Sequence, residues 1–115
     1  MSDRELLEWA AKAVGKPGVH QNWKDECGNL SQGIAVNGAP GRLWWNPLTD
    51  DGDALRLAVD LRLTISYERY DDTDYVVATP PHTHQGYDCA VDQDPRSATR
   101  RAIGRAAAAV GKALP

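Results

Sequence analysis

Twenty consecutive residues, Trp44 to Leu63, combine the end of a strand, a turn and the start of a helix, and they constrain the fold more than any other stretch. Pro47 has no backbone N–H and biases its predecessor towards extended backbone, so a strand over Arg42 to Trp45 must end there. Thr49 or Asp50 can then act as helix N-cap, because each side chain carries an oxygen that accepts from free backbone N–H groups. The stretch therefore predicts a strand, a turn and a capped helix.

Acidic residues gather at the start of this predicted helix, at Asp51 and Asp53, where the helix dipole favours negative charge. This placement accounts for the acidic run without a bound calcium ion. Arg56 and Asp60 are expected to form an exposed pair four residues apart. The residues that recur at helical spacing behind them are Ala54, Leu55, Ala58, Val59 and Arg62.

Two further helices are predicted at the ends of the chain. Ser2 and Glu5 form an S-x-x-E capping box, and the apolar stripe behind it predicts a helix over Asp3 to Val14. Asp94 followed by Pro95 marks the start of the last helix. The alanines of this helix face one way, and its basic residues face mainly the other: Arg96, Arg100, Arg101, Arg105 and Lys112.

The clearest strand pattern lies after the central helix. Residues 63 to 68 alternate between apolar and polar side chains, and Tyr75 to Thr79 is rich in β-branched and aromatic residues. The acidic segment Arg69 to Asp74 between them favours a turn. These segments predict a β-hairpin, with a short edge strand around Tyr87 to Val91.

The segment before the central helix has a weaker pattern. Residues 18 to 32 are polar and without periodicity, so we expect a long surface segment with Trp23 as its large anchor. Ile34 and Val36 lie on one side of the glycine-rich connector Asn37 to Gly41, with Leu43 and Trp45 on the other. This arrangement predicts a hairpin with a loop longer than two residues.

The complete pattern predicts a single α+β domain over residues 1–115. It consists of three helices packed with a three- to four-stranded, mainly antiparallel sheet, in the order α-β-β-α-β-β-α. The length suits one modest core without metals or disulfides. No apolar run approaches the ~20 residues that span a bilayer, and a signal-peptide pattern is absent, so we expect no membrane contact and a cytoplasmic protein whose Cys27 and Cys89 are free thiols.

Charge is strongly segregated along the chain, although the net charge is only -3. Residues 48 to 94 carry eleven Asp or Glu and three Arg, whereas residues 95 to 115 carry five basic residues and no acid. One interpretation is that the basic last helix packs near the acidic middle or presents a solvated face. The other is a contact surface patterned by charge.

One cluster has the residue types of a metal site. His82 and His84 have H-x-H spacing, which allows two imidazoles on one side of a strand, and Cys89 follows nearby. The sequence has no C-x-x-C and no H-E-x-x-H, so a solvated loop is the preferred interpretation. We expect no metal and no cofactor.

Nucleic-acid binding and catalysis both have little support. The arginines of the last helix, with Trp44 and Trp45 as stacking platforms, would suit a weak nucleic-acid module, but an acidic chain with pI near 5.5 lacks the usual basic field. No G-x-S-x-G, P-loop or G-x-G-x-x-G motif occurs. The sequence predicts a protein that is not an enzyme.

Three segments together carry a family resemblance: ELLEWAAKAVG from Glu5 to Gly15, WNPLTDDGDALRLAV from Trp45 to Val59, and ATRRAIGRAAAAVGKAL from Ala98 to Leu114. They resemble small uncharacterised phage and prophage proteins of Gram-negative hosts and, more distantly, the phage alpha-beta-alpha sandwich domain. Leu48 stands where the distant pattern has Ser. The resemblance covers about half the chain and implies a compact domain with a small antiparallel sheet and packed helices, without an assigned active site.

These observations lead to two hypotheses for function. The first is a phage accessory protein that acts by protein contact in the host cytoplasm, in host takeover or against a defence system such as CRISPR. Its expected contact residues are Trp23, Trp44, Trp45, Arg96, Arg100, Arg101 and Arg105. The second is a structural or self-associating phage protein, a homodimer built on the alanine-rich helix or on a sheet edge.

Overall fold

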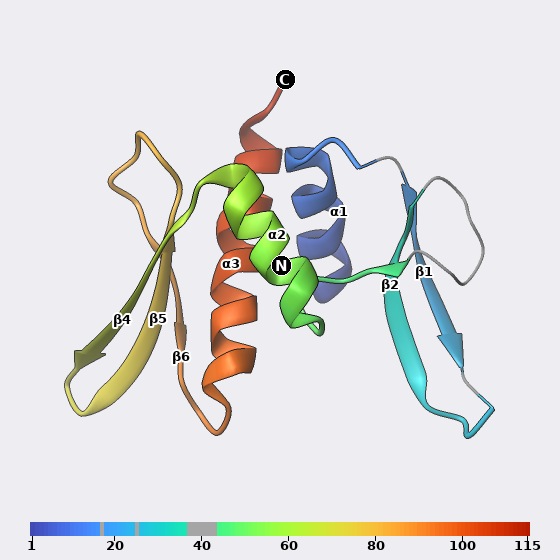
Figure 1. The fold of residues 1–115 in the computed structure, drawn as a ribbon, viewed down its shortest axis with the longest axis horizontal. Coiled ribbons are helices and arrows are strands. Elements are labelled where there is room, and N and C mark those ends of the chain that lie inside the picture. The colour runs from blue at the N-terminus through green and yellow to red at the C-terminus, as the bar shows by residue number, and fades with distance from the viewer. Residues whose placement is uncertain (17, 25, 37–43) are drawn as a thin grey trace.

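A computed structural model describes the chain except for residues 17, 25 and 37–43, and it leaves the side chains of Val36 and Trp44 undescribed (Figure 1). The predicted α+β class and the order of helices and strand pairs are confirmed. The elements are α1 (Asp3–Ala13), β1 (Gly18–Lys24), β2 (Leu30–Val36), β3 (Trp44–Trp45), α2 (Asp51–Leu61), β4 (Thr64–Tyr70), β5 (Thr73–Thr79), β6 (Tyr87–Ala90) and α3 (Pro95–Ala113).

The strands form two antiparallel sheets, where the sequence predicts one. One sheet has the order β1-β2-β3 and the other β4-β5-β6, and the three helices stand between them (Figure 1). Every strand pairs with its neighbour in sequence, and α2 separates the two sets. Strand β3 ends at Trp45, two residues before Pro47, and proline cannot continue a ladder.

The expectation of an irregular surface segment over residues 18 to 32 is wrong. Most of it forms β1 and the start of β2, paired in register from Gly18 with Val36 to Lys24 with Leu30. The pattern is hidden because β1 is an edge strand whose side chains are mostly exposed, so apolar alternation is not required. His20 is the exception, at 8% exposure, and its ring shares a 2.8 Å hydrogen bond with Gln32.

The pairing of β2 with β3 agrees with the predicted hairpin. Ile34 lies opposite Trp45, and Ala35 lies opposite Trp44. The glycine-rich connector of this hairpin, together with Arg42 and Leu43, lies outside the described residues.

Helix α2 begins as predicted, with Asp50 as N-cap accepting from the backbone N–H of Asp53 over 2.7 Å. Its buried face is rotated from the predicted one. Leu57 is 1% exposed, whereas Leu55 and Val59 are 64% and 65% exposed. The buried face of α2 contains Ala54 and Leu57, which are three residues apart. Leu55 and Val59 therefore point to solvent.

The main core lies where α1, α2 and α3 meet β2 and β3, with Leu7, Ile34 and Leu57 among its most buried side chains. A second cluster packs the alanines of α3 under β5. Two glycines of α3 allow neighbouring segments to pack closely against this helix. A Cβ on Gly104 would lie 2.7 Å from a Leu48 side-chain carbon, and one on Gly111 would overlap the backbone carbonyl of Trp9.

Helices α1 and α3 begin at the predicted N-cap residues. Ser2 accepts from the backbone N–H of Glu5, and Asp94 accepts from that of Arg96 with Pro95 in the first turn. In the part of the chain that the structure describes, each helix is too short or too polar to cross a bilayer.

Candidate functional site

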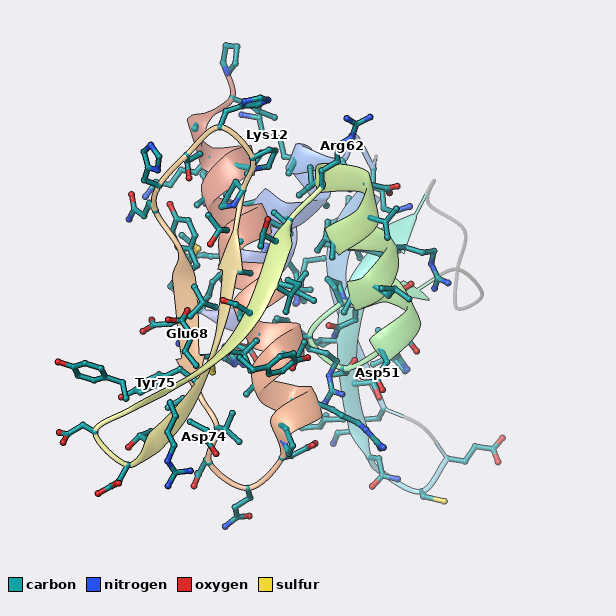
Figure 2. The ribbon with its side chains drawn as sticks, turned by 60° about the vertical axis from the view of Figure 1, so that its left-hand side comes forward. Lys12, Asp51, Arg62, Glu68, Asp74 and Tyr75 are labelled. Atoms are coloured by element: carbon teal, nitrogen blue, oxygen red, sulfur yellow. The ribbon has the colours of Figure 1, made fainter. Side chains whose placement is uncertain are left out.

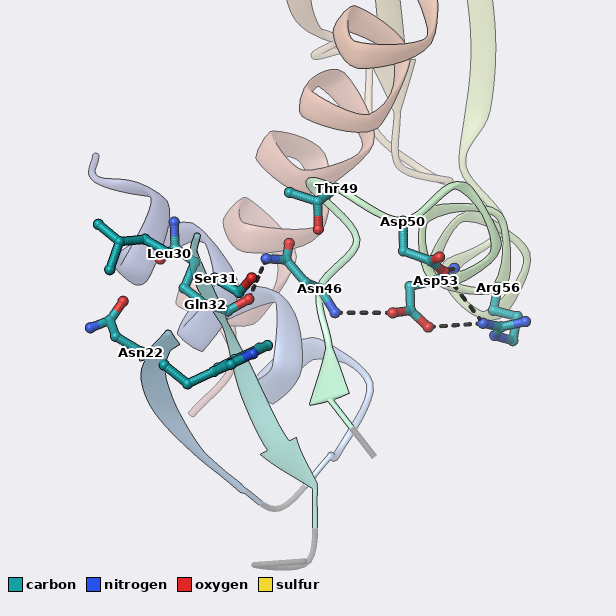
Figure 3. A pocket seen from close by; sticks show the side chains of 10 residues that line it. Asn22, Leu30, Ser31, Gln32, Asn46, Thr49, Asp50, Asp53 and Arg56 are labelled. Atoms are coloured by element: carbon teal, nitrogen blue, oxygen red, sulfur yellow. Dashed lines mark hydrogen bonds and ion pairs between the residues drawn. The ribbon is translucent and has the colours of Figure 1, made fainter. Parts of the chain in front are cut away.

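An open groove of about 720 Å³ lies between the β1–β2 hairpin and the start of α2. We call it the hairpin groove. Trp23 and Ser31 line it from the hairpin, and Thr49, Asp50, Asp53 and Arg56 line it from the other side, with Asn46 between them (Figure 3). Trp23 is half-buried, whereas Leu30, which lies opposite Lys24, is 75% exposed on the other face of the hairpin. The groove thus combines apolar and charged walls.

Asn46 joins the two walls of the hairpin groove through three hydrogen bonds. Its side-chain Nδ2 donates to the backbone carbonyl of Gln32 over 2.8 Å, and its Oδ1 accepts from the backbone N–H of Leu48 over 2.9 Å. Its own backbone N–H donates to Asp53 Oδ2 over 3.0 Å (Figure 3). Because Asn46 is 7% exposed, these bonds replace lost hydration and fix β2 against α2.

Asp53 is shared between Asn46 and a surface arginine. Its Oδ1 accepts from Arg56 Nη2 over 2.8 Å, and a carboxylate oxygen of Asp50 lies 3.8 Å from the same nitrogen. The hydrogen bond from Arg56 to Asp53 raises the pKa of the guanidinium, and the negative charges of Asp53 and Asp50 add to that effect. Arg56 therefore pairs with residues three and six positions earlier, and the predicted pair with Asp60 is wrong.

The three tryptophans expected at a contact surface have different positions. Trp23 lies in the hairpin groove, where its ring reaches to 3.7 Å from the position of a Cβ built on Gly33. Trp45 is 4% exposed, belongs to the main core, and has the ammonium of Lys16 over its ring at 6.0 Å. The side chain of Trp44 lies outside the described part. Trp23 is therefore the tryptophan that the structure places at a groove.

The arginines expected on a basic face of α3 are mostly bound within the chain. Arg100 donates to the Leu48 carbonyl over 3.0 Å and pairs with Asp51 over 2.6 Å, and its side chain is 16% exposed. Arg101 pairs with Asp3 over 2.9 Å. Arg105 donates to the Asp88 carbonyl over 2.6 Å, and Arg96 is exposed. The basic helix thus packs near acidic segments, as the first interpretation of the charge pattern holds.

The residues of the metal hypothesis do not form a cluster. His82 and His84 are exposed on the connection between β5 and β6, and Cys89 is half-buried in β6, against the cluster under β5. Within the described ranges, no group of three His, Cys, Asp or Glu side chains is arranged to hold a metal ion. Neither Cys27 nor Cys89 is part of a disulfide bond.

Sequence reasoning missed Asn46, Asp53 and Arg56 as residues of one site. The sequence does contain one signal for Asn46. A polar residue directly before Pro47 is held in extended backbone, so its side chain can reach back to the preceding strand. The contacts across the groove depend on how β2 docks against α2, and the spacing of residues does not encode that docking. The carboxylates here are bound to backbone N–H groups and to Arg56, which leaves the groove suited to recognition by polar and apolar contact.

No protein-family model matches the chain, and neither a curated protein nor a solved structure shows significant similarity to it.

Proposed function

We propose that this chain is a small, non-enzymatic accessory protein that acts by binding another protein through the hairpin groove. The observation that carries the proposal is the pairing of a half-exposed Trp23 on one wall with the charged Arg56 on the other. Tryptophan and arginine are enriched among the residues that dominate protein interfaces.

The groove is built on a fixed frame, which supports a role in binding. Asn46 ties the hairpin to α2, and Asp53 accepts a hydrogen bond from Arg56 on the first turns of that helix. A partner that binds here spends little free energy on ordering these groups. The chemistry that fits is a protein segment with an apolar side chain for Trp23 and a basic or hydrogen-bonding side chain for the wall of Asp50, Asp53 and Arg56, where two carboxylates face one guanidinium.

The phage resemblance supplies the proposed setting. A protein of this kind would work in the cytoplasm of the bacterial host, in host takeover or against a defence system such as CRISPR. Nucleic acid is the less favoured partner, because Arg100, Arg101 and Arg105 already donate to groups of this chain and are less available for phosphates.

Affinity capture with matched variants tests the proposal. Trp23→Ala and Arg56→Glu change side chains that line the groove, and Arg4→Glu changes an exposed arginine on α1 as a control. From a lysate of infected host cells, we expect one reproducible protein that binds the wild type and Arg4→Glu and is lost with both groove variants. A partner that binds all four equally would move the contact elsewhere, and no reproducible partner would contradict the proposal.

A further inference from the structure

Strand β4 forms one edge of its sheet, on a face of the molecule other than the hairpin groove. It pairs with β5 on one side, and along its other side the described residues contribute no further strand. Figure 2 shows the β4–β5 hairpin extending away from the helices, with Glu68 and Tyr75 on it. A seven-residue edge without proline or glycine is a ready template for another strand.

The free hydrogen-bonding groups of this edge belong to alternate residues. Val91 donates to the Asp74 carbonyl over 2.8 Å, so Asp74 directs its backbone towards β6 and not towards Arg69, its opposite residue on β4. By the alternation of an antiparallel ladder, Ile65, Tyr67 and Arg69 direct their backbone N–H and C=O groups outwards. Tyr67 is the middle residue of these three and also the central residue of Thr64–Tyr70. The edge can therefore pair with the same edge of a second copy about a two-fold axis.

That register brings complementary residues together. With Tyr67 opposite Tyr67 of the second copy, Ser66 lies opposite Glu68, and Ile65 lies opposite Arg69, so no like charges face each other.

The side chains next to this edge are also suited to burial. An apolar groove of about 390 Å³ runs beside β4 over α2 and α3, and it is lined in part by Leu55, Ile65, Tyr67 and Ile103. Tyr67 is 68% exposed, and its hydroxyl lies 3.5 Å from the Thr99 hydroxyl on α3. A strand added at the edge would direct its own Ile65 and Tyr67 towards the same groove.

We propose that two copies of this chain form a two-fold symmetric dimer by pairing β4 with β4, which joins two three-stranded sheets into one of six strands. The dimer is independent of the hairpin groove and leaves it open. In this dimer the exposed Leu55 side chain would lie beside the added strand.

Two substitutions at one position test the register. Ser66→Glu places a like charge opposite Glu68 twice in the dimer, and Ser66→Lys places an opposite charge there twice. Sedimentation equilibrium should give a concentration-dependent dimer for the wild type, with Ser66→Lys tighter and Ser66→Glu weaker, and dissociation constants about thirtyfold apart. Lys24→Glu, at the free edge of the other sheet, should leave the wild-type dissociation constant unchanged.

Hydrogen exchange gives a second readout that does not depend on these variants. The amide hydrogens of Ile65, Tyr67 and Arg69 should exchange more slowly as the concentration of wild-type protein rises. A wild-type monomer at high concentration would overturn the proposal and leave the β4 edge to a different protein. A dimer that responds equally to Ser66→Glu and Ser66→Lys, or in which these amides show no added protection, would overturn it as well.

Discussion

The carboxylate of Asp53 accepts a hydrogen bond from the backbone N–H of Asn46 over 3.0 Å, although Asn46 lies four residues before the helix N-cap. Through this contact the first turn of α2 holds the end of β3. The acidic run at the start of α2 therefore has two duties, because Asp50 caps the helix and Asp53 ties the helix to the sheet.

Replacing Asp50 with alanine removes the N-cap of α2. We expect a loss of about 1 kcal/mol in the free energy of unfolding, because the backbone N–H of Asp53 loses its acceptor. For a chain of this length that corresponds to a fall of about 4 °C in the melting temperature. Thr49→Ala, at the other candidate cap residue, should leave the melting temperature nearly unchanged. An unchanged melting temperature for Asp50→Ala would show that Asp50 is not the cap.

Replacing Asn46 with alanine should have a larger effect. The substitution leaves the Gln32 carbonyl and the Leu48 backbone N–H without their side-chain partner in a site that is 7% exposed. We expect a loss of about 3 kcal/mol, measured by urea denaturation. Asn22→Ala is a suitable control, because Asn22 is exposed on the same groove. A similarly small change in both variants would refute the bridging role of Asn46.

The two buried glycines of α3 should respond differently to alanine. Gly111→Ala places a Cβ against the backbone carbonyl of Trp9 on α1, which cannot move without separating the helices, and we expect a loss of about 3 kcal/mol. Gly104→Ala meets a terminal carbon of the Leu48 side chain, which can rotate, and it gains about 1 kcal/mol of helix propensity. In thermal denaturation, the melting temperature of Gly104→Ala should be well above that of Gly111→Ala. The reverse order would contradict the close packing of α3 against α1 at Gly111.

Arg100 should contribute to stability, in contrast to a solvent-exposed basic residue. Its guanidinium binds both the Leu48 carbonyl and Asp51, so Arg100→Ala should cost about 2 kcal/mol, and Arg100→Lys should recover only part of this. Arg96→Ala, on the same helix but exposed, should change the free energy of unfolding by less than about 0.5 kcal/mol. Equal losses from Arg100→Ala and Arg96→Ala would argue that Arg100 is not a structural anchor.

The local signals in the sequence predict the helices well. Caps at Ser2, Asp50 and Asp94 act within three residues of themselves, so their effect does not depend on the rest of the fold. The hairpin of β4 and β5 is equally local, because Asp71 and Asp72 supply its turn with positive φ.

What the sequence does not predict depends on contacts between distant segments. β1 was missed because a polar edge strand buries few side chains, and the exposure of Leu55 and Val59 follows from where α3 and β4 leave α2 uncovered. The candidate site also depends on such contacts. Trp23 and Arg56 line the same groove because the β1–β2 hairpin docks beside α2.

The most direct test of the proposed function is hydrogen exchange of the chain with and without the partner recovered by affinity capture. Binding at the hairpin groove predicts slower exchange in the β1–β2 hairpin and in the first turns of α2, with β4 unaffected by the partner. Protection confined to other segments, with the hairpin and α2 unchanged, would contradict the assignment of the groove as the contact site.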